Sequence, residues 1–425
     1  MMSATLLVLF LVLMLIRLPI AICLGLSSAV VMILFNLPMT VLAQRTVNAL
    51  DSTPLLAVPL FIFAASLLST SGVTNHLFEL VRMMVGWIRG GTAQVSVLVS
   101  LIFSGVSGAA LADIGALGSI QIKMMRKQGY SAEFASGITM AAATIGPIFP
   151  PSIPIIIFAS VANVSAVKLL IAGIVPAVLI TVLLMLQVGV MARIYKLPRD
   201  EVKFDWAAFG RKFVVSLPAL AAPVLLIGGL ISGYFGPTEV AGVTVAYALF
   251  IGKFIYRELD VKRIIAAARD TVDATGSVLF IVATAALFAW VLTMDRLPAT
   301  ASAFLLDLSD NPLILLFIVN VLLLVVGMFL ESIAAILIIA PIITPALTAA
   351  GVDPLQLGIV FVLNLMIGLL TPPVGMSLYM VSIIAKMPLH RVIRGALPFL
   401  IPLFLSLLAV TCIPAISTWL PNLLG

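Results

Sequence analysis

The sequence has few of the side chains that carry most enzymatic chemistry. Its 425 residues include only two histidines and two cysteines, and 9% of the residues are charged. Soluble domains contain about 25% charged residues, so this composition excludes an ordinary soluble protein. The sequence has no Cys/His cluster with metal-ligand spacing and no G-x-x-x-x-G-K-S/T loop. We therefore expect neither an enzyme nor a machine driven by nucleotide hydrolysis within this chain.

The cysteines give no information about the redox compartment, and the net charge predicts no nucleic-acid partner. Cys23 and Cys412 lie far apart in apolar runs, and we expect both to be buried structural residues that report no redox compartment. The 23 basic and 17 acidic residues leave a formal charge of +6. This excess is modest and scattered along the chain, so the sequence predicts no nucleic-acid partner.

Apolar sequence is abundant instead. Hydrophobic residues make up 63% of the chain, in recurring runs of the roughly 20 residues that cross a bilayer as a helix. The sequence therefore predicts a polytopic α-helical membrane protein embedded in a lipid bilayer. The first run has no basic n-region and no small-residue cleavage site, so we interpret it as a membrane span. Because Arg17 and Pro19 interrupt it early, it is either one long kinked helix or two spans.

One apolar stretch, ATIGPIFPPSIP at 143–154, contains a glycine and four prolines. Proline removes a backbone donor and clashes with the preceding turn, so a regular helix cannot continue through it. The stretch GLLTPPV at 368–374 repeats this break at an offset of 368 − 146 = 222. The same ungapped offset pairs other glycines, prolines and aspartates, which indicates a tandem duplication. These pairs include Asp51/Asp273, Gly105/Gly327, Gly129/Gly351, Gly173/Gly395 and Pro176/Pro398.

The distribution of basic residues predicts how the halves face. Arg82 and Arg89 precede the apolar run 94–122, and Lys123–Lys127 follows it. The positive-inside rule places both basic clusters in the cytoplasm, which a single crossing does not allow. A re-entrant hairpin with its tip at Ser104–Asp113 removes the conflict. Its repeat-mate, with a tip at Gly327–Ala335, is flanked by acidic residues and is expected to enter from outside.

These observations predict an all-α polytopic membrane protein, built as an inverted repeat with two re-entrant hairpins and two discontinuous helices. The first repeat is predicted at 1–190, a cytoplasmic linker at 193–212, and the second repeat at 213–425. Within the first repeat we expect scaffold spans at 1–75, a hairpin and broken helix at 92–162, and a closing span at 169–192. Within the second, the corresponding ranges are 213–293, 312–385 and 395–418.

Paired broken helices are the best sequence indication of a transporter's central site. Unwound backbone at membrane depth must be buried in protein or line a wet cavity, where its carbonyl groups can bind a cation. The side chains near the tips and breaks are small and mostly neutral, with no Lys or Arg among them. Bound cations could then balance an anionic substrate, and hydroxyl and carbonyl oxygens suit a hard ion such as Na⁺. The candidates are Ser104, Ser107, Thr144, Ser152, Ser332, Asn364 and Thr371.

Two carboxylates, Asp113 and Glu331, each follow a hairpin tip. The simpler interpretation is a favourable interaction with a helix N-terminus. The alternative is binding of a coupling ion or a proton. The two are not repeat-mates, because Asp113 pairs with Ala335 and Glu331 with Ala109, and this asymmetry weakens a shared ion-binding role.

Several segments resemble one known family. They are LLAVPLFIFAASLL (55–68), FSGVSGAALADIGALGSI (103–120), GYSAEF (129–134), IGPIFPPSIP (145–154) and GLLTPPVGMSLY (368–379). In this order they are similar to the large membrane subunit of tripartite ATP-independent periplasmic (TRAP) transporters, over nearly the whole chain. The alternative, a stand-alone sodium/dicarboxylate symporter of related inverted-hairpin fold, would need no binding protein.

The resemblance implies a Na⁺-coupled, elevator-type symporter in a bacterial cytoplasmic membrane. It also implies a small four-helix membrane subunit and a periplasmic solute-binding protein, which delivers an organic acid such as a C4-dicarboxylate or sialic acid. Matching motifs place one sodium site at Ser104, Ser107, Gly146, Phe149 and Pro151. A second falls at Gly327, Gly368, Thr371 and Val374. The substrate is expected near Ser107, Thr144, Ser152 and Asn364.

Overall fold

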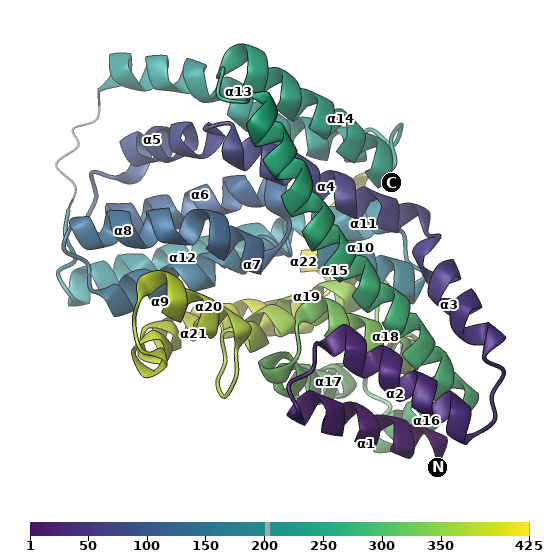
Figure 1. Cartoon of the computed structure of the whole chain (residues 1–425). Coiled ribbons are helices and arrows are strands. Elements are labelled where there is room, and N and C mark those ends of the chain that lie inside the picture. The colour runs from purple at the N-terminus through teal and green to yellow at the C-terminus, as the bar shows by residue number, and fades with distance from the viewer. Residues whose placement is uncertain (200–204, 425) are drawn as a thin grey trace.

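The computed structural model describes residues 1–199 and 205–424, and every regular element among them is a helix. Eight helices are long and apolar enough to cross a membrane, by length and composition. The predicted linker 193–212 includes residues 200–204, which lie outside the described residues. Because every regular element that the structure describes is a helix, the predicted all-α fold class is confirmed (Figure 1).

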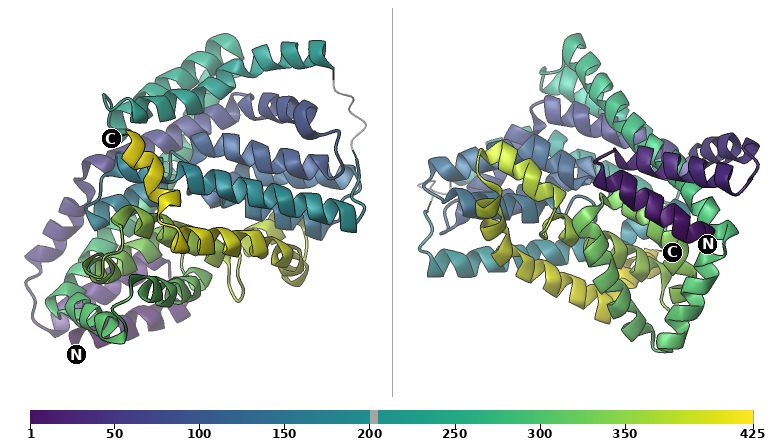
Figure 2. Two further views of the ribbon diagram at one scale, coloured as in Figure 1. Left: turned by 180° about the vertical axis from the view of Figure 1, so that it is seen from behind. Right: turned by 60° about the horizontal axis from the view of Figure 1, so that its bottom comes forward.

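The first apolar run forms two helices, α1 (Met2–Leu15) and α2 (Ile20–Leu34). Arg17 between them has a φ of 67°, in the left-handed region, and Pro19 is the N-cap of α2. The two helices pack against each other and lie side by side (Figure 2). The run is thus a helical pair rather than one kinked helix.

One long helix in the second half of the scaffold corresponds to two helices in the first half. The first half has α3 (Thr40–Leu50), α4 (Thr53–Thr70) and α5 (Val73–Val85), with Pro54 in the first turn of α4. In the second half, α13 (Trp206–Ile231) and α14 (Pro237–Phe250) precede α15 (Val261–Met294). Subtracting 222 places α15 at 39–72, so one helix replaces both α3 and α4. No proline interrupts α15, which crosses the molecule diagonally in Figure 1.

Two helical hairpins are present. In the first, α6 (Gly91–Ser107) turns at Gly108 into α7 (Ala110–Asp113), a π-helical turn (Ile114–Gly118) and α8 (Ser119–Lys127). In the second, α17 (Pro312–Phe329) turns directly into α18 (Ser332–Ala349). Subtracting 222 from the second pair gives 90–107 and 110–127, which coincides with the first hairpin to within one residue. The duplication is therefore present in the helices themselves.

Both helices predicted to be discontinuous are broken at their prolines. The first break separates α9 (Ala132–Ala143) from α10 (Ile153–Ala162), and the second separates α19 (Pro354–Leu369) from α20 (Met376–Ala385). The Pro150–Pro151 and Pro372–Pro373 peptide bonds are cis. The remaining helices are α11 (Ala166–Ala172), α12 (Ile174–Ile194), a π-helical turn (Ile251–Ile255) after α14, α16 (Leu297–Leu308), α21 (Leu389–Cys412) and α22 (Ala415–Leu424).

The two halves interlock where α9 crosses α21. A Cβ atom on Gly137 would lie 1.9 Å from the carbonyl oxygen of Gly395, and one on Gly395 would lie 2.1 Å from that of Glu133. Only glycine permits this backbone approach. Arg391 also donates a hydrogen bond of 2.6 Å to the Glu133 carboxylate at the same crossing. The broken helix of the first half is thus held by the closing span of the second.

The cysteines behave differently from each other. Cys23 is fully buried in α2, as predicted. Cys412 is exposed at the end of α21, so the prediction that it is buried is wrong. An apolar sequence around a residue does not distinguish burial in protein from a surface that faces lipid.

Candidate substrate and ion site

Both hairpin tips and both broken helices line one cavity of about 420 Å³. Ser107 and the segment Ala109–Ala112 come from the first tip, and Glu331–Ile333 comes from the second. The first broken helix contributes Pro147, Ile153 and Pro154, and the second contributes Met366 and Leu369. The opposite side is the frame wall, formed by α4 and α15. Its residues are Ile62, Ala65, Ser66, Ser69, Thr70, Asp270, Ala274 and Val278.

The first hairpin tip docks directly on the first break. Gly108 has a φ of 68°, and a Cβ atom on it would lie 2.1 Å from the carbonyl oxygen of Pro151. Its own carbonyl oxygen accepts a hydrogen bond of 3.3 Å from the backbone N–H of Ile153. A Cβ atom on Gly105 would meet the side chains of Pro223 at 2.6 Å and Phe149 at 3.3 Å. The tip therefore sits where only glycine fits.

The second tip docks on the second break in the same manner. A Cβ atom on Gly368 would lie 2.5 Å from the carbonyl carbon of Gly327, so the two backbones touch. The backbone N–H of Gly375 donates a hydrogen bond of 3.0 Å to the carbonyl oxygen of Met328. The donors at the two breaks are repeat-mates, because 153 + 222 = 375. In each break, the residue at the same repeat position thus donates the hydrogen bond that joins the break to its hairpin.

The hydroxyl groups predicted to bind ions have different surroundings. The Ser107 side chain is 4% exposed and lines the cavity, and its hydroxyl lies beside the Asp113 carboxylate. Ser104 is fully buried and donates to the carbonyl oxygen of Ser100 at 2.6 Å. Thr371 donates to the carbonyl oxygen of Ile367 at 2.8 Å. These three oxygens keep lone pairs that a cation can use, because each hydroxyl is a donor in any bond that it makes.

The backbone positions of the two predicted sodium sites lie at the contacts between tips and breaks. Pro151 faces Gly108 and Phe149 faces Gly105, while Gly327 and Gly368 touch each other. Val374 lies in the second break, one residue before Gly375. Pro151, Phe149, Gly327 and Gly368 therefore lie where each tip meets its break. Among the described residues, no group of three or more His, Cys, Asp and Glu side chains could hold a metal.

Three of the four predicted substrate residues lie outside the cavity lining. Thr144 is buried and donates to the carbonyl oxygen of Ala141. Ser152 is also buried, and its hydroxyl caps α10 by accepting from the N–H of Ile155 at 3.2 Å. Both residues support the first break and do not line the cavity. Of the four predicted substrate residues, Ser107 alone is among the described residues that line it.

Asn364 belongs to a buried polar network behind the second break. Its side-chain amide donates 2.9 Å hydrogen bonds to the backbone carbonyl and side-chain oxygens of Asn320. The Asn320 amide in turn donates to the hydroxyl of Thr411 at 2.9 Å. The network ties α19 to α17 and α21. Asn364 therefore holds the second hairpin against its broken helix and does not line the cavity.

The two carboxylates differ in role. Glu331 is the N-cap of α18 and accepts from the backbone N–H groups of Ile333 at 3.0 Å and Ala334 at 3.4 Å, so the simpler interpretation is correct for it. Asp113 is 2% exposed, and its carboxylate lies beside the Ser107 hydroxyl. A Cβ atom on Gly146 would lie 2.4 Å from the Asp113 Oδ2 atom, so this carboxyl group rests on the first break.

The frame wall is the part of the site that sequence reasoning missed. Ser66, Ser69 and Thr70 of α4 face the cavity. Their spacing of three and four residues places them on one helix face, which was a usable signal. Asp270 of α15 completes the polar part of this wall.

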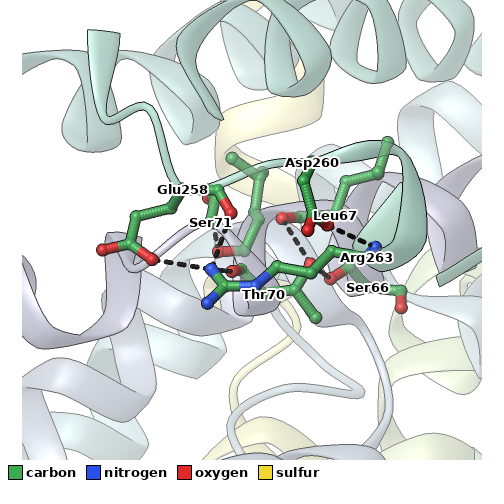
Figure 3. Close-up of polar contacts among 8 residues, drawn as sticks. Ser66, Leu67, Thr70, Ser71, Glu258, Asp260 and Arg263 are labelled. Atoms are coloured by element: carbon green, nitrogen blue, oxygen red, sulfur yellow. Dashed lines mark hydrogen bonds and ion pairs between the residues drawn. The ribbon is translucent and has the colours of Figure 1, made fainter. Parts of the chain in front are cut away.

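An arginine clamp fixes the end of α4 at Thr70, a residue of the cavity wall (Figure 3). The Arg263 guanidinium donates to the backbone carbonyl and the carboxylate of Glu258, both at 2.6 Å, and to the carbonyl oxygen of Thr70 at 3.4 Å. Asp260 caps α15 by accepting from the backbone N–H of Arg263 at 2.8 Å. The clamp joins the end of α4 to the start of α15, so the frame wall is braced across the two halves.

Paired hairpins and broken helices around one cavity are the architecture of a secondary transporter. The family model for the DctM component of tripartite ATP-independent periplasmic transporters matches residues 7–416. The chain belongs to this family and is a multi-pass protein of the bacterial inner membrane.

Curated relatives agree with this assignment, and a solved structure shares the fold. The sialic acid TRAP transporter large permease protein SiaM of Vibrio cholerae is 39% identical over 384 residues, 90% of this chain and 89% of its own. The C4-dicarboxylate TRAP transporter large permease protein DctM of Pseudomonas aeruginosa is 40% identical over 407 residues, 95% and 94% of the two chains. The Alcanivorax borkumensis YdaH transporter shares the fold, with a TM-score of 0.65 and 18% identity over 90% of this chain and 89% of that one.

Proposed function

We propose that this protein is the large permease subunit of a TRAP transporter and carries an organic acid into the cell together with Na⁺. The observation that carries the proposal is the single cavity lined by both hairpin tips and both broken helices. No Lys or Arg is among the described residues that line it. An acid bound there needs a counter-charge from elsewhere, and cations at the two contacts between tips and breaks would supply it.

The two ion sites are proposed where each tip meets its break. At the first, the buried Ser107 hydroxyl lies beside the buried Asp113 carboxylate, which rests against Gly146. A buried carboxylate is stable only when it is protonated, paired or bound to a cation. This donor set of hydroxyl, carbonyl and carboxylate oxygens fits a hard cation such as Na⁺.

We propose that the hairpins and broken helices move together against the frame of α4 and α15, as in an elevator. The cavity mouth at Ser69, Thr70 and Asp270 adjoins the basic segment 253–269, which the positive-inside rule assigns to the cytoplasm. The conformation described here then opens inward. A bound cation lowers the cost of moving the substrate charge past apolar surface.

The proposed assembly has two further components, a small membrane subunit and a periplasmic binding protein that delivers the acid. The tripartite organisation named by the family supports both. The relatives carry different acids by name, so the family does not fix the acid that this chain carries.

The test is uptake by proteoliposomes that contain this chain and its small subunit, with the binding protein outside. We expect accumulation of the acid only with an inward Na⁺ gradient, and none with a K⁺ gradient of equal size. Accumulation without Na⁺ would contradict the coupling. Accumulation without any binding protein would instead support a stand-alone symporter.

Replacing Thr371 with alanine should weaken Na⁺ activation. The change removes one hydroxyl oxygen from the proposed second ion site, and one hydrogen-bonding group is worth about 1 kcal/mol, or roughly a fivefold change in binding. We therefore expect the Na⁺ concentration for half-maximal uptake to rise about fivefold. Measuring uptake against Na⁺ concentration in proteoliposomes checks this.

Thr348→Ala is the matched control for this prediction. Thr348 makes the same type of bond, from its hydroxyl to the carbonyl oxygen of Thr344 at 2.8 Å, but it lies at the far end of α18 from the tip. We expect its Na⁺ activation curve to match that of the unmodified protein. Equal curves for both variants would remove Thr371 from the ion site.

A further inference from the structure

A second cavity, of about 580 Å³, also lies between the frame and the hairpins and broken helices, but it shares no lining residue with the first. On α15 the first cavity uses the range 270–278 and the second uses 282–293, further from the basic segment 253–269. Its other walls are α3 and α4 of the frame, and α10 and α18. Because the positive-inside rule assigns the basic segment to the cytoplasm, the second cavity lies toward the outer face of the membrane.

The frame side of this cavity, which we call the outer wall, is related by the repeat to the frame wall of the first. The outer wall consists of Arg45, Ala49, Leu55, Val282, Ala286, Ala289, Trp290 and Thr293. The α4 range 62–70 of the frame wall corresponds to 284–292, because 62 + 222 = 284, and the α15 range 270–278 corresponds to 48–56. Alternating access moves one body of a transporter against the other around the bound substrate. The tips are therefore expected to meet the outer wall when the transporter opens outward.

The second cavity differs from the first in charge. Arg45 is the one charged residue among the described residues that line it, whereas Asp270 and Glu331 line the first cavity. Within the part of the chain that the structure describes, the Asn163 amide and the Trp290 indole make no hydrogen bond, so both N–H groups can donate to a ligand. A cation together with neutral donors suits an anion.

Arg45 has no competing partner. It is exposed on α3, and its guanidinium makes no hydrogen bond or ion pair with any described residue. Asp51, at the end of the same helix, does not line the cavity. Asp295, at the end of α15, accepts from the backbone N–H of Ser3 at 2.7 Å and lies 3.4 Å from the N-terminal ammonium group. A guanidinium group without a partner can bind a carboxylate through two parallel hydrogen bonds.

We propose that the second cavity is an outer binding site for a carboxylate, in which Arg45 holds the acid before the hairpin tips reach it. This rests on the proposed function, because the ligand is the acid that the transporter carries. Since Arg45 belongs to the frame, the tips and the acid leave it behind when they move inward. The acid then loses this counter-charge on the inner side, which favours its release there.

The test is the labelling rate of a cysteine in the second cavity. Thr293→Cys in a Cys412→Ser background places one exposed thiol there, because Cys23 is fully buried. The full chain and a cysteine-free small subunit are placed in phosphatidylcholine nanodiscs, in a low-salt choline buffer without Na⁺, and treated with a maleimide. We expect succinate or N-acetylneuraminate to slow labelling in a saturable way, and succinamide, the uncharged diamide of succinate, to leave it unchanged. Labelling that neither acid slows would overturn the proposal.

Variants assign the protection to one cation. Arg45→Gln removes the charge, so we expect the acid concentration for half-maximal protection to rise at least about tenfold. Arg45→Lys keeps the charge and should stay within about fivefold of the unmodified protein. Arg296→Gln is the matched control, because it removes an exposed cation near the end of α15 that does not line the cavity, and the change should be less than about twofold. Unchanged protection in Arg45→Gln would overturn the role of Arg45.

A lipid phosphate offers Arg45 the same chemistry as a carboxylate, so the source of the anion is tested separately. The labelling is repeated without acid in nanodiscs that contain phosphatidylglycerol. We expect the same rate as in phosphatidylcholine. Slower labelling that Arg45→Gln reverses would assign the site to a lipid headgroup and overturn the acid as its ligand.

Uptake separates this proposal from the proposed function. In proteoliposomes with the binding protein outside, Arg45→Gln should raise the acid concentration for half-maximal uptake at least about threefold and leave the Na⁺ requirement unchanged. An unchanged concentration would overturn the role of Arg45 while the Na⁺-coupled function stands. Protection of Thr293→Cys by acid, together with uptake that does not require Na⁺, would support the outer site and contradict the coupling.

Discussion

Gly108→Ala is expected to abolish transport while leaving most of the helical fold in place. Gly108 has a φ of 68°, and a Cβ atom there would lie 2.1 Å from the carbonyl oxygen of Pro151. The left-handed conformation alone costs a non-glycine residue roughly 1–2 kcal/mol. The overlap with a backbone atom adds to this, because the break cannot move without losing the bond from Ile153 to Gly108. We expect uptake in proteoliposomes to fall at least about tenfold.

Gly351→Ala is the matched control, because it shares the backbone conformation without the contact. Gly351 has a φ of 94°, and a Cβ atom there would meet nothing within 4 Å. We expect a lower melting temperature and near-normal uptake for this variant. If both variants lose uptake equally, backbone strain explains the loss and the docking of the tip on the break does not.

Gly368→Ala is expected to have a comparable effect at the proposed second ion site. Its Cβ atom would lie 2.5 Å from the carbonyl carbon of Gly327 and 2.6 Å from its Cα atom. Neither neighbour can rotate away, because both are backbone atoms. The hairpin and the broken helix must therefore separate, which pulls apart the oxygens proposed to bind Na⁺. We expect uptake to fall at least about tenfold, with Na⁺ activation shifted to higher concentration.

Gly276→Ala tests whether the effect is specific to the contact. Gly276 lies within α15, and a Cβ atom on it would meet nothing within 4 Å. Alanine stabilises a helix interior by about 0.5–1 kcal/mol relative to glycine, so uptake should be retained and the melting temperature should not fall. Normal uptake by the Gly368 variant would show that the two backbones need not touch during transport.

The sequence alone predicted the repeat and the two proline breaks. Proline and glycine act through their own backbone, so Gly146–Pro151 and Gly368–Pro373 predict interruptions wherever the chain runs. The 222-residue offset then predicted that both hairpins turn at corresponding positions, as Gly108 and Leu330 do. Local chemistry also favoured an interaction of Glu331 with a helix N-terminus, and its carboxylate does accept from backbone N–H groups two and three residues away.

Only the tertiary structure decided which side chains face the cavity. Asn364 and Ser107 are both small polar residues in apolar helices, yet Asn364 is bonded to Asn320 on another helix and Ser107 lines the cavity. Asp113 and Glu331 looked equivalent beside their tips, but one lies on a break and the other caps a helix. The sequence could place Ser66, Ser69 and Thr70 on one helix face, but only packing shows that this face lines the cavity. The surroundings of a side chain depend on packing between segments far apart in the chain, which local sequence rules do not contain.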